Sequence, residues 1–208
     1  MHIINNDFPI DGYTQILSRG DHGIESLEFA LLNLRADSTY SGDTDDCQVV
    51  LVTLGGKCKL LVGHNGNKAI GLLGNRPNVF SGRASVAFIP HHTTFEIITT
   101  DESIEIAVFR KTSHLDTAAV ISNLYLNEDT SQYGIKIDES KILYESIGES
   151  ICFYRFQHEN DSAAVKLIEP DKQSARIVLS NNDLICLPDL TRTNLLSYQG
   201  NCYQLSVS

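Results

Sequence analysis

The clearest pattern along the chain is a series of short alternations of apolar and polar residues between positions 74 and 110. Three runs stand out, at 86–90, 96–100 and 104–108, and the polar residues 101–103 separate the last two. Alternation with a period of two is typical of half-buried strands. Short strands that repeat every 8–12 residues or so favour an antiparallel barrel or sandwich over alternating strands and helices. The sequence therefore predicts an all-β fold.

Similar runs flank this segment on its N-terminal side. An alternating strand is expected from Ser26, and the turn formers in 38–46 predict a polar loop. The apolar stretch 47–54 predicts a strand that ends in a hairpin turn at Gly55 and Gly56. A return strand over 57–62 and a second turn at 64–67 complete this part. Residues 1–24 show little periodicity and are expected to form an extended arm.

The pattern of apolar and polar residues changes after residue 110. Ser113 and Asp116 have the spacing of a helix capping box, which predicts a short helix near 118–125. A polar segment follows at 127–134. Alternation then returns at 135–144, and apolar runs at 151–156, 182–188 and 203–207 predict a second β-barrel. We therefore expect an N-terminal barrel over 1–112, a linker with a possible short helix over 113–134, and a shortened C-terminal barrel over 135–208.

Composition narrows the possible partners and the compartment. The formal net charge of the 208 residues is −10, and the 16 Lys and Arg residues form no cluster. This argues against nucleic acid or an anionic membrane as a partner. No apolar run is long enough to span a bilayer, and the start of the chain does not have the pattern of a secretory signal. The 5 cysteines are widely spaced and odd in number, so they predict free buried thiols and a cytoplasmic protein.

The 74–110 segment also carries a motif. Gly74, Arg76, Val79, Phe80 and Gly82 spell G-x-R-x-x-V-F-x-G, followed by Pro90, Thr93 and the block 105–108. This order and spacing resembles the N-terminal half of the 5-deoxy-glucuronate isomerases of inositol catabolism. The related 4-deoxy-5-keto-uronate isomerases share the same architecture. Further along, residues 151–156 end in Tyr-Arg-Phe as the family's aromatic strand does, and 182–188 and 203–207 resemble its last two strand motifs.

The resemblance implies a bicupin, that is, two small antiparallel barrels of the double-stranded β-helix or jelly-roll type. It implies an aldose–ketose isomerase of sugar acids, in which the first barrel is structural. In the family, the second barrel holds a divalent metal such as zinc. Its ligands are an H-x-H motif, a Glu just before the aromatic strand and a His after the strand-ending Pro.

The chain departs from the family at this site. No H-x-H occurs in the sequence, Ser150 takes the position of the Glu ligand, and Arg192 takes that of the last His. Glu149 is adjacent to the Glu position, but a shift of one residue in a strand reverses the face of the side chain. We therefore expect no metal cofactor, and the activity of the family is in doubt.

Without the metal, the second barrel remains a candidate pocket. Alternation places Cys152, Tyr154 and Phe156 on one strand face, with Arg155 on the other. We select Tyr154, Arg192 and the adjacent Glu149 as substrate-binding candidates, because an Arg can hold a carboxylate with two hydrogen bonds. The alternative is that Arg192 forms a surface ion pair and Tyr154 packs in the core. No catalytic residue is assigned.

The histidines give weaker candidates. In the first barrel, the metal frame of cupins survives only as Gln48-x6-Gly55, with Gln where a Glu is needed. The second half of the cupin motif needs a His a few residues after the strand-ending Pro, whereas His91 and His92 follow Pro90 directly. They are expected in a solvated turn, and the alternative is that they are metal ligands. His114 and His158 remain as replacement ligands or surface residues. Arg76 is expected to be a structural clamp.

Two hypotheses of different class follow. The chain is either a sugar-acid isomerase, or a non-catalytic, metal-free bicupin that binds a sugar acid or serves as an interaction module. A homo-oligomer is possible in both cases, because barrel edges often pair between subunits.

Overall fold

A computed structural model describes residues 2–4, 11–64, 67–113, 118–122, 137–140, 146–147, 150–158, 161–168, 174–187 and 192–207. The chain divides into two compact units. The first unit consists of Pro9–Ser18 and Glu28–Lys136, and the second of Met1–Phe8, Arg19–Leu27 and Ile137–Ser208. The start of the chain therefore contributes to both units.

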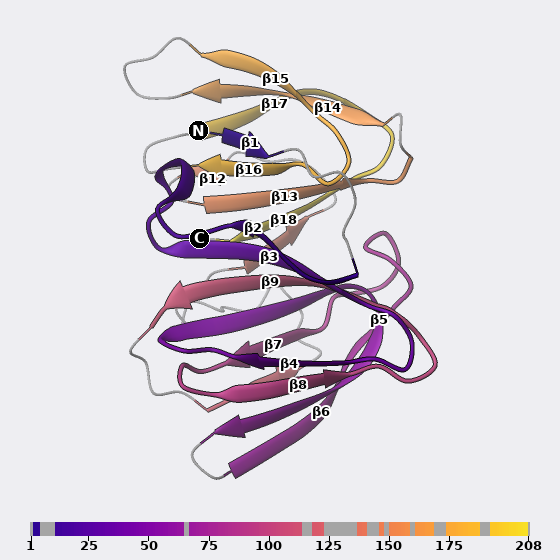
Figure 1. Cartoon of the computed structure of the whole chain (residues 1–208). Helices are drawn as coiled ribbons and strands as arrows, with labels where there is room; N and C mark the ends of the chain where they lie inside the picture. Colours follow the sequence, from indigo (N-terminus) through magenta and orange to yellow (C-terminus); the bar gives the residue numbers. More distant parts are fainter. Residues whose placement is uncertain are drawn as a thin grey trace. The chain divides into compact units, whose positions relative to one another are not determined.

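The first unit is built on a 9-stranded antiparallel sheet. Six strands follow the order β10-β7-β5-β9-β3-β2, β6 and β8 also pair with β5, and β4 pairs with β8 (Figure 1). Their bounds are β2 Gly12–Leu17, β3 Leu27–Leu34, β4 Thr39–Asp43, β5 Cys47–His64, β6 Asn67–Arg76, β7 Val86–Ile89, β8 Thr94–Ile98, β9 Ile104–Thr112 and β10 Val120–Ser122. The three strands expected within 86–108 are confirmed.

Strand β5 organises this unit and corrects one expectation. The hairpin turn expected at Gly55 and Gly56 is wrong, because residues 47–64 form one continuous strand. The pairing register shifts beside both glycines, and Gly56 has a φ of 86°. Before this bulge β5 pairs with β7 and β9, and after it with β6 and β8. The glycines bend the strand from one set of partners to another instead of reversing it.

The core of the first unit is aliphatic. One cluster of buried side chains includes Leu32, Leu51, Leu60, Ile97 and Ile106, which come from β3, β5, β8 and β9. Phe95 joins this cluster, and Tyr40 packs against it with its ring centroid 6.2 Å from that of Phe95. Removing such surface from water contributes about 25 cal/mol per Å² of buried apolar area. The interior of this unit is therefore a packed core.

Two further expectations for the first unit are corrected. Thr39–Asp43, expected within a polar loop, form the edge strand β4, because Tyr40 turns inward while its neighbours face solvent. The short helix expected near 118–125 is wrong at 120–122, which pair with Phe88, Ala87 and Val86 of β7. The remainder of that expected helix lies mostly outside the described residues.

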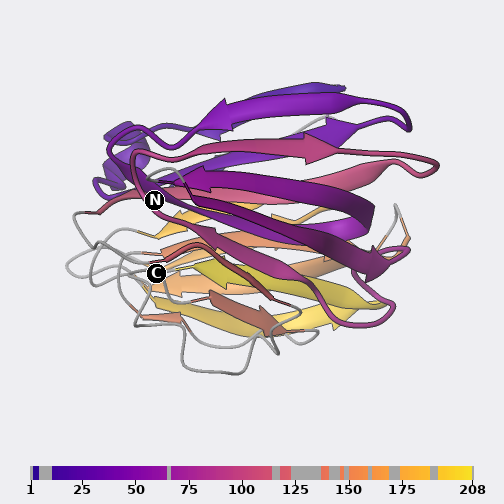
Figure 2. The same cartoon turned by 90° about the horizontal axis from the view of Figure 1, so that it is seen from below.

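The second unit contains two antiparallel sheets. The first has the strand order β1-β16-β13-β18-β11 and the second β12-β17-β14-β15, and neighbouring strands run in alternating directions (Figures 1 and 2). Their bounds are β1 His2–Ile4, β11 Ile137–Ser140, β12 Ser146–Ile147, β13 Ser150–Phe156, β14 Ser162–Ile168, β15 Ala175–Leu179, β16 Leu184–Leu187, β17 Arg192–Gln199 and β18 Cys202–Val207. The predicted strands at 151–156, 182–188 and 203–207 are therefore confirmed as β13, β16 and β18.

One core joins the two sheets of the second unit. Its buried cluster takes Cys152, Tyr154 and Phe156 from β13 and Cys202 from β18, with further members from β14, β15 and β16. The expectation that 152, 154 and 156 share a face is confirmed. Arg155 lies on the opposite face, with its guanidinium carbon 5.2 Å from the ring centroid of Phe153.

Helical structure is sparse. In the described part of the chain, it is limited to the 3-10 turn η1, Asp21–Gly23. No helix among these residues is long and apolar enough to cross a membrane.

Candidate functional site

One end of the second unit contains the starts of β13 and β17 and the end of β16. Strand β13 begins at Ser150, which pairs with Leu187 at the end of β16. Only a few residues later the chain enters β17 at Arg192, whose backbone pairs with Ile147 of β12 and Ile168 at the end of β14. The start of β13, the end of β16 and the start of β17 thus lie at one end (Figure 1). We call it the Ser150 end.

Polar side chains lie on the inner face of the five-stranded sheet. Opposite residues of an antiparallel pair share a face, and β13 and β18 pair Cys152 with Ser206 and Tyr154 with Gln204. Since Cys152 and Tyr154 belong to the core cluster, Gln204 and Ser206 face the same interior. The Cys152 Sγ lies 3.6 Å from the Ser206 Oγ, within hydrogen-bonding reach.

The Gln204 side chain is the most unusual of this set. The residue is 1 % exposed. Neither its Oε1 nor its Nε2 has a hydrogen-bond partner in the described part of the chain. Leaving one such group buried and unpaired costs about 1–3 kcal/mol. The great majority of buried polar side-chain atoms in native proteins are paired, so this amide requires an explanation.

The three binding candidates differ in what the structure says of them. Tyr154 is 1 % exposed and packs in the core of the second unit, as the structural alternative proposed. Its backbone N–H donates to the Asp183 carbonyl oxygen, and its own carbonyl oxygen accepts from the Asn182 N–H. For Arg192 only the backbone is described, at the start of β17. Glu149 lies outside the described residues.

Burial controls several titratable groups of the second unit. It raises the pKa of the Cys202 thiol to about 12 and, as the largest cause, that of Cys186 to about 12. Burial also raises the pKa of Asp183, while the hydrogen bond from the Ser180 N–H to its Oδ2 opposes the shift. All 5 cysteines are buried and none forms a disulfide, which confirms the expectation of reduced thiols.

The described inner-face donors of β13 and β18 do not fit the metal of the resembled isomerases. First-row ions in such sites are held by imidazole, thiolate or carboxylate groups. These two strands offer hydroxyls, an amide and the thiols of Cys152 and Cys202. No group of three or more His, Cys, Asp or Glu residues suited to a metal ion occurs in the described part of the chain.

The candidate histidines that the structure describes do not supply such a site. His91 and His92 lie in the bend after β7, with ring centroids 4.9 Å apart and nearly perpendicular planes, and His92 is exposed with a φ of 51°. His158 is exposed in the turn after β13. His114 lies outside the described residues.

Arg76 acts as a structural clamp within the first unit. It is 2 % exposed, and its Nε and Nη2 donate to the Thr53 carbonyl oxygen at 3.1 and 2.7 Å. The guanidinium thereby ties the end of β6 to β5. This agrees with the role expected from the sequence motif and leaves Arg76 unavailable to a ligand.

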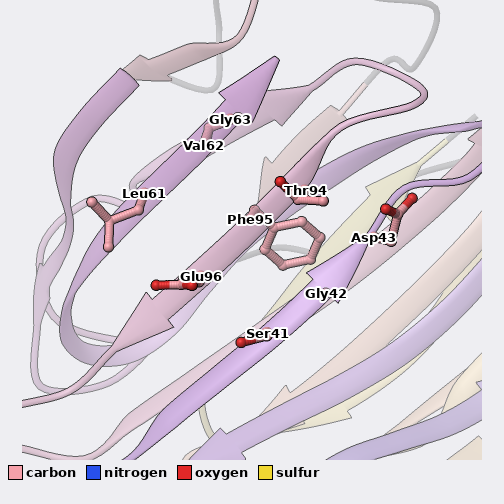
Figure 3. Close-up of a pocket in the computed structure, with 9 residues that line it drawn as sticks. All are labelled: Ser41, Gly42, Asp43, Leu61, Val62, Gly63, Thr94, Phe95 and Glu96. Carbon is pink, nitrogen blue, oxygen red and sulfur yellow. The ribbon is translucent and has the colours of Figure 1, made fainter. Parts of the chain in front are cut away.

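The first unit carries a separate pocket of about 610 Å³ (Figure 3). It is lined by three consecutive residues from each of β4, β5 and β8, namely 41–43, 61–63 and 94–96. The charged side chains among these described lining residues are those of Asp43 and Glu96. Two carboxylates repel a sugar acid, so this pocket does not suit the expected ligand.

Sequence reasoning missed Gln204 and Ser206. The signal was present, because polar residues alternate with Tyr203, Leu205 and Val207 in an otherwise apolar strand. What the sequence did not provide was the pairing register, which places these two side chains opposite Tyr154 and Cys152.

The antiparallel sheets of the chain have the cupin fold. It is similar to a single-site mutant of oxalate decarboxylase from Bacillus subtilis, with a TM-score of 0.61 and 8% identity, covering 97% of this chain and 74% of that one. It is also similar to vicilin from Capsicum annuum, with a TM-score of 0.56 and 12% identity, covering 89% and 76%.

Within the cupins, a family model matches residues 10–129, more than half of the chain, and shows that it belongs to the KduI/IolB family. An IolB-like protein from Salmonella typhimurium LT2 has a TM-score of 0.76 and 15% identity, covering 100% of this chain and 92% of that one. No curated protein matches the sequence. The resemblance found in the sequence motifs is thus confirmed at the level of the family.

Proposed function

We propose that this chain is a metal-independent bicupin that binds a small sugar acid at the Ser150 end of its second unit. The observation that carries the proposal is the polar part of the inner face of the second unit. Tyr154, Gln204 and Ser206 lie there among core side chains, and neither polar atom of the Gln204 amide has a partner among the described residues. Buried polar groups in a concave site are what fixes the orientation of a small ligand.

The sugar acid is supported by family membership and by Arg192. A guanidinium at this end would hold the ligand carboxylate with two charge-assisted hydrogen bonds, without a metal. With a formal net charge of −10 for the whole chain, such a local cation is needed to attract an anionic ligand. The free, buried thiols favour a reducing compartment, the cytoplasm.

The test is calorimetric titration with D-glucuronate in the presence of a chelator. We expect binding that the chelator does not weaken, and a loss of roughly 10- to 100-fold in affinity for Arg192→Ala, the effect of removing a charged hydrogen bond. Arg176→Ala is the matched control, because Arg176 is an exposed arginine on β15 of the same unit. Equal affinities for both variants and the wild type would contradict the proposal.

Membership of the KduI/IolB family favours a second candidate, aldose–ketose isomerisation of a sugar acid. Metal analysis of the same protein sample decides between the two. One bound zinc, manganese or iron ion per chain, together with turnover of a uronate, would establish the isomerase and refute metal-independent binding. Absence of metal and of turnover, with glucuronate bound, would leave the non-catalytic binder.

A further inference from the structure

We infer that the Gln204 amide is a ligand-contacting group that recognises a pair of neighbouring hydroxyls on the bound molecule. This inference rests on the proposed function and adds the specificity of the inner part of the same site. Its basis is an amide that is 1 % exposed and has no hydrogen-bond partner for Oε1 or Nε2 among the described residues.

The position of Gln204 aims this amide into the barrel interior. It lies on β18, the strand between β13 and β11, and it pairs with Tyr154 on one side and Ser140 on the other. Its inner-face neighbours along β18 are Cys202 and Ser206. The Cys202 thiol is protonated at neutral pH because burial raises its pKa to about 12. Ser206 is already within reach of the Cys152 thiol. On the other side of β18, the backbone of Asp138 in β11 pairs with that of Ser206.

A buried amide selects for a particular chemistry. Its Nε2 donates hydrogen bonds and its Oε1 accepts them, so it complements a group that accepts and donates side by side. Two adjacent sugar hydroxyls have this property, and a bare carboxylate, which only accepts, does not. Gln204 would therefore read the hydroxyls of the ligand. A site built to hydrogen-bond a hydroxyl rejects analogues that lack it, because its own polar group is then left unpaired.

The chain provides a matched control in Gln48. This glutamine in β5 of the first unit is 2 % exposed, and its Oε1 and Nε2 likewise have no partner in the described ranges. Gln→Met removes the amide at nearly constant shape. Both Gln204→Met and Gln48→Met should therefore raise the melting temperature of the ligand-free protein, by about 2–4 °C each. Only Gln204→Met should affect the ligand.

The experiment is a titration of wild type, Gln204→Met and Gln48→Met with three probes: D-glucuronate, D-glucose and hexanoate, which has a carboxylate but no hydroxyls. We expect Gln204→Met to weaken glucuronate at least tenfold, to abolish any binding of glucose and to leave hexanoate unchanged, while Gln48→Met matches the wild type.

The outcomes separate this inference from the function on which it rests. Wild-type binding of glucuronate with an equal affinity in Gln204→Met would overturn the role of Gln204 and leave the sugar-acid proposal standing. Binding of glucose but not glucuronate, lost in Gln204→Met, would support Gln204 and overturn the sugar-acid proposal. Failure of the wild type to bind any probe would overturn both.

Discussion

Gly56 and Gly12 both have positive φ values, of 86° and 103°, but their surroundings differ. A Cβ atom at Gly56 would lie 2.0 Å from the Ser103 carbonyl oxygen, whereas one at Gly12 would meet nothing within 4 Å. A side chain at Gly12 would thus strain only the backbone. At Gly56 it would also force apart β5 and the residue that precedes β9, where the long strand bends.

We therefore predict that Gly56→Ala lowers the free energy of unfolding by at least about 2 kcal/mol, since strain and collision add. Gly12→Ala should cost about 1 kcal/mol, close to the strain of the backbone conformation alone. Urea unfolding of the two variants measures both. Equal losses would show that β5 and Ser103 can move apart at Gly56 without penalty.

Two residues of the same type can have different roles in this chain, depending on the strand residues with which they pair. Gln48 and Gln204 are both buried amides in strands, and nothing in composition or spacing distinguishes them. The pairing register makes the difference, because it places Gln204 across from Tyr154 in the core of the second unit. This is why the candidate site could be predicted only as far as Tyr154, Arg192 and Glu149.

At the scale of elements, periodicity predicted most of the strands but not all of their ends. Alternation located β7, β8 and β9 because each presents one buried face. It failed at Gly55 and Gly56, since a glycine pair has the same local signature in a bulge and in a hairpin turn. It failed at β4, whose turn-forming residues become a strand only because β8 offers an open edge. Tertiary pairing decided both cases.

Strand β1 shows the same dependence on a distant partner. His2–Ile4 pair with Cys186, Ile185 and Leu184 and complete one edge of the sheet that contains the Ser150 end. Removing residues 1–4 exposes the backbone groups of β16 at that edge. We predict that amide exchange in β16 becomes roughly tenfold faster, because a local opening no longer has to break this pairing.

Hydrogen-exchange mass spectrometry of the truncated chain measures this effect. Peptides from β4 and β8 in the first unit serve as the internal control and should exchange as in the full chain. Unchanged protection of β16 would show that β1 contributes no stability to the sheet.

At the scale of the whole molecule, the division into two units does not follow the order of the chain. Residues 1–8 and 19–27 belong with 137–208, and β3 begins at Leu27 in the second unit and continues through the first. Because segments of the two units alternate along the chain, we expect their unfolding to be linked. The chain is therefore expected to lose both cores in one transition.

The buried thiols test this coupling. Cys47 and Cys58 lie in the first unit and Cys152, Cys186 and Cys202 in the second. With pKa values of about 12 for Cys58, Cys186 and Cys202, these thiols are almost entirely protonated at pH 8, and the thiolate is the reactive form. We predict negligible reaction with Ellman's reagent in the native state, and reaction of all 5 in a single phase near the unfolding midpoint.

Two phases, one releasing two thiols and the other three, would instead show that the units unfold independently. A fast native-state reaction of any one thiol would contradict its burial. Protein fully unfolded in urea gives the reference count.

The pairing of β1 with β16 also sets an order of events during synthesis. Roughly 180 residues separate the two strands, and at ribosomal rates of about 5–20 residues per second β1 waits on the order of 10–40 seconds for its partner to be made. The strands of the first unit are complete well before then. The newly made N-terminal segment must therefore stay unpaired, and protected from wrong partners, until the last part of the chain emerges.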